Sequence, residues 1–263
     1  MVRGFFNARF GTADYAESFA VLENYIRFFK DPTARKAVFN TLYFSFGAIA
    51  GDFFLGTLCA VFLVKIKRTW ASVLRPIVTI PLLISPVVVG LIWRYIYDPR
   101  GILYWFLGLF GLGMGQFPGL TAASTSMLSV IIAHCWQVTP FVVIVLTAGL
   151  LSIADEYYEA AKIDGAGAFS IFFRITLPQL RSVYMVIMLI SGVDTIKVFD
   201  IIYSLTGGGP NNSSVSLSIY AYSQGFEQSN LSYSMAISFM TMLITFIIFG
   251  IPFMRHNLGK GNR

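Results

Sequence analysis

The chain has 263 residues, of which 56% are apolar and only 12% charged, and its mean hydropathy is +0.69. An ordinary soluble domain carries about 25% charged residues, so this composition excludes that class and indicates a membrane protein. The net charge of +6 does not point to nucleic acid, because the basic residues form short clusters beside apolar runs, as in proteins oriented in a bilayer.

Five apolar stretches are long enough to cross a bilayer as helices, which takes about 20 residues each. None of them shows a charged face that recurs every three or four residues, as a surface helix would. The expected spans are 37–64, 73–96, 127–151, 183–205 and 233–254. The sequence therefore predicts an all-α, polytopic membrane protein.

The placement of lysine and arginine predicts how these spans are oriented. Basic residues gather in the turn after the first span, in the polar stretch before the fourth span and in the C-terminal tail. Five spans place these three regions on one side of the membrane, and the positive-inside tendency makes that side the cytoplasm. Residues 98–126 and 206–232 are then expected outside.

One domain is visible, with three parts. We expect an external N-terminal segment over 1–36, a transmembrane domain over 37–255 that includes a cytoplasmic loop at 152–181, and a cytoplasmic tail over 256–263. The N-terminal segment is rich in arginine and lysine although an odd number of spans places it outside. It shows no signal-peptide pattern.

The cytoplasmic loop begins with the pattern of a short helix. Ser152 and Asp155 are spaced as a capping box, in which a hydroxyl accepts a bond from the third residue's backbone and that residue's carboxylate returns it. We expect the helix to cover 155–163. Gly165 and Gly167 can end it, because glycine adopts a positive φ at little cost.

The surface of this helix suits contact with a partner. Its spacing places four residues on one face, which the alanines keep slim: Tyr157, Ala160, Ala161 and Asp164. A helix of about ten residues is marginal alone in water, so its rigidity must come from docking. A second amphipathic piece is expected over 168–176, with Phe169, Phe172, Phe173 and Thr176 near one side, and Pro178 is expected to start the next span.

The loop resembles a known motif. The runs Glu159-Ala160-Ala161 and Asp164-Gly165-Ala166, followed by Ile175, Leu177 and Pro178, resemble the EAA loop of binding-protein-dependent ABC importers, E-A-A-x-x-D-G-A with an I-x-L-P ending. The alternative is an ordinary amphipathic turn between membrane helices. Matching all of these positions together makes the importer loop the better interpretation.

This resemblance implies a function and a set of partners. The fold would be the six-helix core of a type I importer permease, in a bacterial inner membrane. The partners would be an ATP-binding subunit dimer, a second permease subunit that forms a heterodimer with this chain, an extracytoplasmic solute-binding protein and membrane lipid. ATP and magnesium would be bound by the ATPase, while this chain would hold no cofactor and no catalytic residue. The residues implied in coupling are Glu156, Glu159, Ala160, Ala161, Asp164, Gly165, Ala166, Leu177 and Pro178.

Two further stretches extend the resemblance. Phe199–Tyr203 and the glycine run Thr206–Pro210 resemble the corresponding region of sugar permeases of the maltose and glycerol-phosphate type, which implies a carbohydrate or polyol as the solute. Residues 21–31 resemble the external stretch that follows the first helix in six-helix permeases. This implies that an initial span is missing, and the alternative is a true five-span protein.

Polar residues inside the expected spans are candidates for the substrate path. Asp194, Lys197 and Asp200 lie one turn apart in the fourth span, and Gln137 lies in the third. Ionisable groups in a bilayer tend to face protein or water, so they either form a neutral structural cluster or line the cavity. His134 has no metal-like neighbour, which favours hydrogen bonding over a metal site.

The sequence fits two other function classes less well. A secondary transporter driven by an ion gradient would show broken helices at equivalent positions in two halves, and no such symmetry is apparent in the sequence. An intramembrane enzyme would need a catalytic motif such as H-E-x-x-H, which the sequence lacks.

Overall fold

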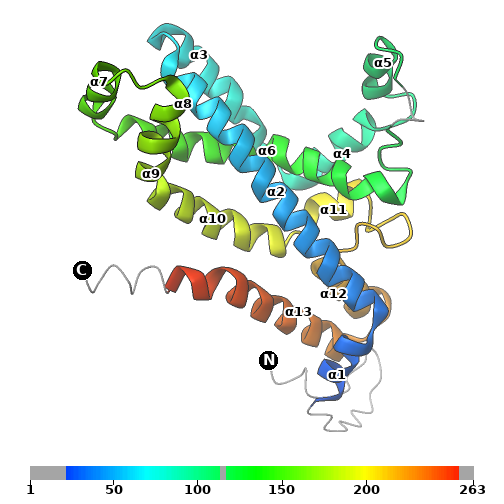
Figure 1. The fold of residues 1–263 in the computed structure, drawn as a ribbon. Coiled ribbons are helices and arrows are strands. Elements are labelled where there is room, and N and C mark those ends of the chain that lie inside the picture. The colour runs from blue at the N-terminus through cyan, green and yellow to red at the C-terminus, as the bar shows by residue number, and fades with distance from the viewer. Residues whose placement is uncertain (1–21, 113–116, 255–263) are drawn as a thin grey trace. The chain divides into compact units, whose positions relative to one another are not determined.

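The computed structural model describes residues 22–112 and 117–254, and the regular structure within these residues is helical (Figure 1). Of the short elements, η2 is a 3-10 helix, and η3, η4 and η5 are π-helical turns. The elements in chain order are α1 (Glu23–Lys30), α2 (Pro32–Lys65), α3 (Arg68–Thr79), η2 (Ile80–Leu83), α4 (Pro86–Ile96), α5 (Ile102–Gly108), α6 (Ala123–Leu151), α7 (Asp155–Ile163), α8 (Ala168–Ile171), η3 (Phe172–Thr176), α9 (Leu177–Gln179), α10 (Arg181–Ile196), α11 (Asp200–Leu205), α12 (Leu217–Tyr222), η4 (Ser223–Glu227), α13 (Leu231–Thr245) and η5 (Phe246–Gly250).

Three of the described helices are long and apolar enough to cross a bilayer: Pro32–Lys65, Ala123–Leu151 and Leu231–Met254. Two more spans are bent helix pairs. Thr69–Leu83 meets Pro86–Ile96 at 97°, and Ala168–Gln179 meets Arg181–Ile196 at 65°. When each bent pair counts as one span, the described residues hold up to five, which is the number predicted. Residues 1–21 of the predicted N-terminal segment and the whole predicted tail, 256–263, lie outside the described residues.

Two of the predicted spans are not continuous helices. The span predicted over 73–96 breaks at Ile84, where η2 ends and α4 begins. Proline causes this, because Pro81 is the second residue of η2 and Pro86 is the first residue of α4, and neither residue can donate a backbone hydrogen bond to a preceding turn.

The span predicted over 183–205 ends at Ile196, and a separate helix, α11, starts at Asp200. The backbone carbonyl of Val198, which lies in the gap, accepts a hydrogen bond from the Ser216 hydroxyl at 3.1 Å. The expectation that Pro178 starts the next span is also wrong. Pro178 lies in the short helix α9, and α10 begins after the bend, at Arg181.

The chain forms two compact units, and α2, α6 and α10 contribute residues to both. In the first unit (1–48, 85–134 and 192–263), Asp31 joins α1 and α2 to α12 and α13. Its carboxylate accepts hydrogen bonds from the Tyr220 and Tyr233 hydroxyls, the latter at 2.7 Å, and from two backbone N–H groups at the start of α2. Partial burial alone would raise the pKa of Asp31, but these bonds outweigh it and hold the pKa below its ordinary value.

The glycine run Thr206–Pro210 forms a turn, and the residues that follow it are fixed to α2 within the same unit. Asn40, which is buried in α2, donates from its amide to the backbone carbonyls of Asn212 and Val215, each at 3.0 Å. Gly208 has φ of +90°, a conformation that favours glycine. The run therefore has a structural function as a tight turn.

The second unit (49–84 and 135–191) has its own apolar core. Gly56 of α2 lies so close to α6 that an added Cβ would be 2.5 Å from a methyl group of Val142. Small residues allow membrane helices this close approach, which increases their van der Waals contact. The buried members of the core are Ala60, Leu63, Val142, Val143, Leu146, Leu150, Ile153, Leu180 and Ile187.

Candidate functional site

The short helix predicted over 155–163 is confirmed as α7, but its predicted capping box is wrong. The N-cap residue is Ala154, which makes no side-chain capping bond. Ser152 stays with the end of α6 instead, where its hydroxyl donates to the carbonyl of Gly149 at 2.7 Å. That carbonyl lies in the last turn of α6 and has few other donors within reach, so it takes the hydroxyl.

The C-terminus of α7 is a Schellman motif, and it accounts for the Asp-Gly-Ala part of the sequence pattern. The backbone N–H of Ala166 donates to the carbonyl of Ala161 at 2.9 Å, and that of Gly165 donates to Lys162 at 3.1 Å. Gly165 has φ of +74°, as the motif requires. Gly167, the other glycine expected to end the helix, has φ of −71° and is instead the N-cap of α8.

The surface of α7 is divided between a packed side and an open side. Ala161 is buried and the adjacent Tyr158 half-buried, whereas the side chain of Ile163 is 87% exposed and that of Tyr157 is 55% exposed. The four residues predicted to share a face are therefore split, because Ala161 packs against its own unit. The motif residues that remain open are Glu156, Glu159, Ala160, Asp164 and Gly165.

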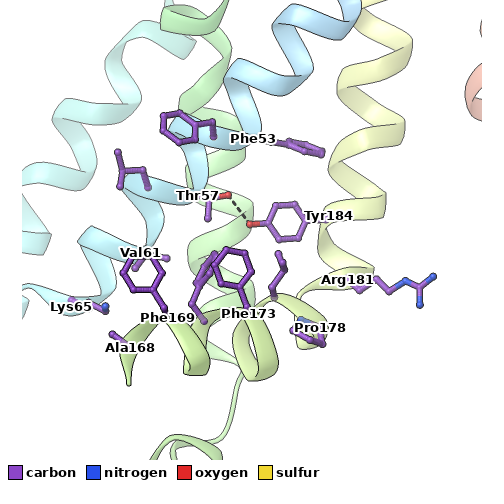
Figure 2. Close-up of a pocket in the computed structure, with 14 residues that line it drawn as sticks. Phe53, Thr57, Val61, Lys65, Ala168, Phe169, Phe173, Pro178, Arg181 and Tyr184 are labelled. Atoms are coloured by element: carbon purple, nitrogen blue, oxygen red, sulfur yellow. Dashed lines mark hydrogen bonds between the residues drawn. The ribbon is translucent and has the colours of Figure 1, made fainter. Parts of the chain in front are cut away.

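Leu177 and Pro178 lie in a different place from the rest of the motif. The segment α8–η3–α9 packs beside α2, and its phenylalanines, with Leu177 and Pro178, line a cavity of about 1070 Å³ (Figure 2). This segment is tied back to α7 by Tyr158, whose hydroxyl lies 3.4 Å from that of Thr176. Leu177 and Pro178 thus belong to the segment that follows α7 and are not part of the exposed surface of α7.

Among the substrate-path candidates, Asp194 and Lys197 are brought together and Asp200 is separated from them. Asp194 and Lys197 form an ion pair at 2.8 Å, and both side chains are more than half exposed. Asp200 starts α11, beyond the end of α10, so the one-turn spacing predicted between Lys197 and Asp200 on a single helix is wrong.

Gln137 has a structural partner. Its amide Nε2 donates to the carbonyl of Ile84 at 2.7 Å, and the Gln137 side chain is buried. Ile84 is the residue at which the bent pair breaks, so its carbonyl has no place in a helical ladder. In a membrane protein such a carbonyl needs an internal partner, and Gln137 supplies it.

Sequence reasoning did not find Asp31 and Asn40. Their partners on α12, on α13 and just after the glycine run lie more than 170 residues away in the chain, so no local pattern signals those contacts; the capping of the start of α2 by Asp31 is local. Asp52 of α2 is fully buried, and Thr139 and Cys135 donate to its carboxylate. Within the described ranges, no group of three or more histidine, cysteine, aspartate or glutamate residues is placed to hold a metal ion.

Membrane-crossing helices joined by a polar loop that carries a short exposed helix define a polytopic membrane protein. The chain belongs to the family described as "Binding-protein-dependent transport system inner membrane component", whose family model matches residues 52–254. It is thus a permease subunit of an ATP-driven importer of the inner membrane and is not itself an enzyme, since in this family the ATPase is a separate subunit.

Relatives in sequence and structure agree with this assignment. The chain is 34% identical to the probable ABC transporter permease protein YurN of Bacillus subtilis, over 87% of this chain and 79% of that protein. It is also 34% identical to the trehalose/maltose transport system permease protein MalF of Thermococcus litoralis, over 86% and 76% of the two chains. A chain of a bacterial ABC transporter involved in the import of the acidic polysaccharide alginate shares the fold, with a TM-score of 0.79, 23% identity, and coverage of 90% of this chain and 83% of that one.

Membership of this family excludes a secondary transporter driven by an ion gradient. The presence or absence of broken helices, which was the criterion taken from the sequence, does not decide the question. Broken helices were not apparent in the sequence, yet the structure contains two bent pairs. Bent spans are therefore compatible with an importer permease, and they do not by themselves identify a secondary transporter.

Proposed function

We propose that this chain is a carbohydrate- or polyol-translocating permease that receives mechanical work through α7. The solute class is supported by the trehalose/maltose permease among its relatives and by the structural neighbour that serves alginate import. The glycine run Thr206–Pro210, which resembles that of sugar permeases, supports the same class.

The observation that carries the coupling role is the open side of α7. A helix of nine residues that leaves Ile163 and Tyr157 largely exposed has apolar surface available for a partner. Glu156 and Glu159 add carboxylates for basic residues of that partner. The Schellman motif fixes how the helix ends, so a force applied to α7 passes to the α8–η3–α9 segment and on to α10.

The partner is an ATPase dimer that binds ATP and Mg²⁺. A second permease subunit completes a heterodimer, and a solute-binding protein delivers the solute to the opposite side of the membrane. In this orientation α7 and the loop 152–181 lie in the cytoplasm, in agreement with the basic residues beside them. The turn held by Asn40 then lies on the side that receives the binding protein.

The solute path passes the exposed ion pair of Asp194 and Lys197 and the nearby Asp200. Their exposure in the isolated chain leaves these groups available to hydroxyl groups of a sugar. Gln137 contributes to the path indirectly, by holding the break at Ile84 in place.

Charge reversal on the open side of α7 tests this function. The substitution Glu159→Lys is expected to abolish solute uptake and binding-protein-stimulated ATP hydrolysis in proteoliposomes, because it places a cation against the basic residues of the partner ATPase. The matched control is Glu23→Lys, which reverses another exposed carboxylate, on α1 and outside the loop. Normal membrane insertion and yield of both variants would show that the defect is one of coupling.

Two outcomes would contradict the proposal. Uptake by the Glu159→Lys variant at the rate of the unaltered protein would remove α7 from the coupling route. A panel of sugars and polyols that fails to compete for uptake, in a transporter that is active with another solute, would refute the solute class and leave the coupling role standing.

A further inference from the structure

The cavity beside the coupling loop is apolar inside and cationic at its edge. We name it the phenylalanine groove, after the five phenylalanines that line it: Phe53, Phe54, Phe169, Phe172 and Phe173. Its volume of about 1070 Å³ is slightly larger than that of ordinary small-molecule sites, which reach about 1,000 Å³. It therefore has room for a substantial apolar ligand.

The interior of the phenylalanine groove offers no unsatisfied polar side chain to a ligand. Thr57 and Tyr184 are the uncharged polar side chains in its lining, and their hydroxyls bond to each other at 2.6 Å (Figure 2). Several of the rings are open, with Phe169 83% exposed and Phe54 71% exposed. In a membrane protein, aromatic rings exposed in this way face either lipid or an apolar surface of another subunit.

Two cations stand at the edge of this apolar surface. Lys65 ends α2 and Arg181 begins α10, and both line the groove. Figure 2 shows them on opposite sides of the Phe169 and Phe173 rings, with the guanidinium group of Arg181 extending outward. Within the described ranges, neither residue takes part in an ion pair. Two cations without an ion-pair partner among the described residues, next to apolar surface, are suited to bind a ligand that is both anionic and amphipathic.

The dimensions of the groove match one membrane leaflet. From Phe53 to Lys65 the helix α2 advances twelve residues, or about 18 Å at about 1.5 Å per residue. The hydrocarbon part of one leaflet is about 15 Å thick, half of a core of about 30 Å. An acyl chain that lies along α2 can therefore reach from the Phe53 end to the level of Lys65, where its headgroup begins.

We propose that the phenylalanine groove binds an anionic phospholipid, with an acyl chain against the phenylalanines and the net negative charge of the headgroup attracted by Lys65 and Arg181 on either side of the groove. An apolar transmembrane helix of a partner subunit would also cover the rings, but it would bring no negative charge to the two cations. The negative headgroup offsets the charge of both cations, while the acyl chain covers the rings. The assignment to the cytoplasmic leaflet rests on the proposed orientation of the loop, whereas the presence of the lipid does not.

A lipid at this position would touch the segment that connects α7 to α10. Phe172 and Phe173 belong to the π-helical turn η3, which follows α8 and precedes the bend before Arg181. The bound acyl chain fills space under η3 and thereby supports the part of the chain through which α7 acts. We expect anionic lipid to favour coupled ATP hydrolysis for this reason.

Photo-crosslinking in the assembled transporter tests the lipid site. The complex of this chain with its transport subunits is placed in nanodiscs of phosphatidylethanolamine that contain a small fraction of phosphatidylglycerol with a diazirine on one acyl chain. After illumination, mass spectrometry should find the label on the peptides that carry Phe53–Lys65 and Phe169–Phe173. Unlabelled phosphatidylglycerol should compete, and phosphatidylethanolamine should not.

Paired variants show whether the two cations hold the headgroup. The double substitution Lys65→Gln with Arg181→Gln is expected to weaken phosphatidylglycerol retention about 30-fold, the loss for removing two interfacial cations. The conservative exchange Lys65→Arg with Arg181→Lys should retain the lipid. The matched control is Lys67→Gln with Arg174→Gln, which removes the same charge from exposed neighbours that do not line the groove.

Three results would overturn the lipid site. These are equal labelling by the two headgroups, labelling that the Lys65 and Arg181 variants leave unchanged, and the absence of lipid label together with crosslinks from the groove to a partner subunit. The experiment uses a complex that hydrolyses ATP in response to its binding protein. A failure of labelling in that active complex therefore counts against the lipid site and leaves the coupling role of α7 intact.

Discussion

The positive φ of Gly165 makes a quantitative prediction about coupling. Alanine at this position must adopt the left-handed conformation, which costs a residue with a Cβ about 1–2 kcal/mol. Such a cost lowers the ratio of ordered to frayed helix end by roughly 5- to 30-fold, and a helix of nine residues has little stability of its own to offset it. We expect Gly165→Ala to reduce solute-driven ATP hydrolysis and uptake by a factor in that range.

Gly167 provides the matched control. An added Cβ would meet nothing within 4 Å at either glycine, so the two positions differ in φ and not in available space. Gly167 has φ of −71°, which alanine adopts freely, and Gly167→Ala should leave uptake unchanged. Gly165→Pro should be more severe than Gly165→Ala, because proline also removes the N–H that donates to Lys162.

Hydrogen exchange of the backbone amides locates the effect. In Gly165→Ala, the amide of Ala166 should exchange faster, because its bond to the carbonyl of Ala161 opens more often. The core of the second unit should exchange as before. Equal uptake and equal exchange in the Gly165→Ala and Gly167→Ala variants would refute the view that the Schellman motif transmits force.

Three further predictions concern stability. Gln137→Leu should lower the free energy of unfolding by about 1–3 kcal/mol, because the carbonyl of Ile84 loses its donor. The measured result should be a lower Tm with an unchanged KM for the solute. A change in KM without a change in Tm would instead place Gln137 on the solute path. Asn40→Ala should cost a similar amount and increase protease sensitivity near residues 206–215, and unchanged cleavage would contradict the anchoring of this turn. The pKa of Asp31 is lowered by folding, so its ionised carboxylate stabilises the fold fully at pH values above the ordinary pKa of 3.8. This stabilisation is lost as the pH falls through the lowered pKa. The difference in Tm between the unaltered protein and Asp31→Asn should therefore be constant from about pH 5 to 8 and become smaller in stronger acid.

The sequence was most informative where the signal is local. The three spans predicted over 37–64, 127–151 and 233–254 and the helix at 155–163 were predicted within about five residues, because hydropathy and glycine placement act over short distances. The breaks in two spans were not predicted, although Pro81 and Pro86 lie on either side of the first one. A hydropathy window averages over such a break, so the prolines had to be weighed separately.

The remaining errors have long-range or competitive causes. The capping box failed because the hydroxyl of Ser152 had a second acceptor, the carbonyl of Gly149 at the end of α6. The role of Gln137 at the break and of Asn40 at the glycine turn depended on partners far along the chain, which a single sequence does not reveal. The open side of α7 could be predicted only in part, since the packing of Ala161 is a tertiary contact.

The contacts of Asp31 also have a consequence for biosynthesis. Tyr220 and Tyr233, which donate to its carboxylate, lie 189 and 202 residues later in the chain. At a translation rate of about 5–20 residues per second, roughly 10 to 40 seconds pass between the synthesis of Asp31 and that of its last donor. Helix α1 cannot dock before then, so the N-terminal end of α2 is secured among the last steps of assembly, and a nascent chain that is released before Tyr233 lacks this closure.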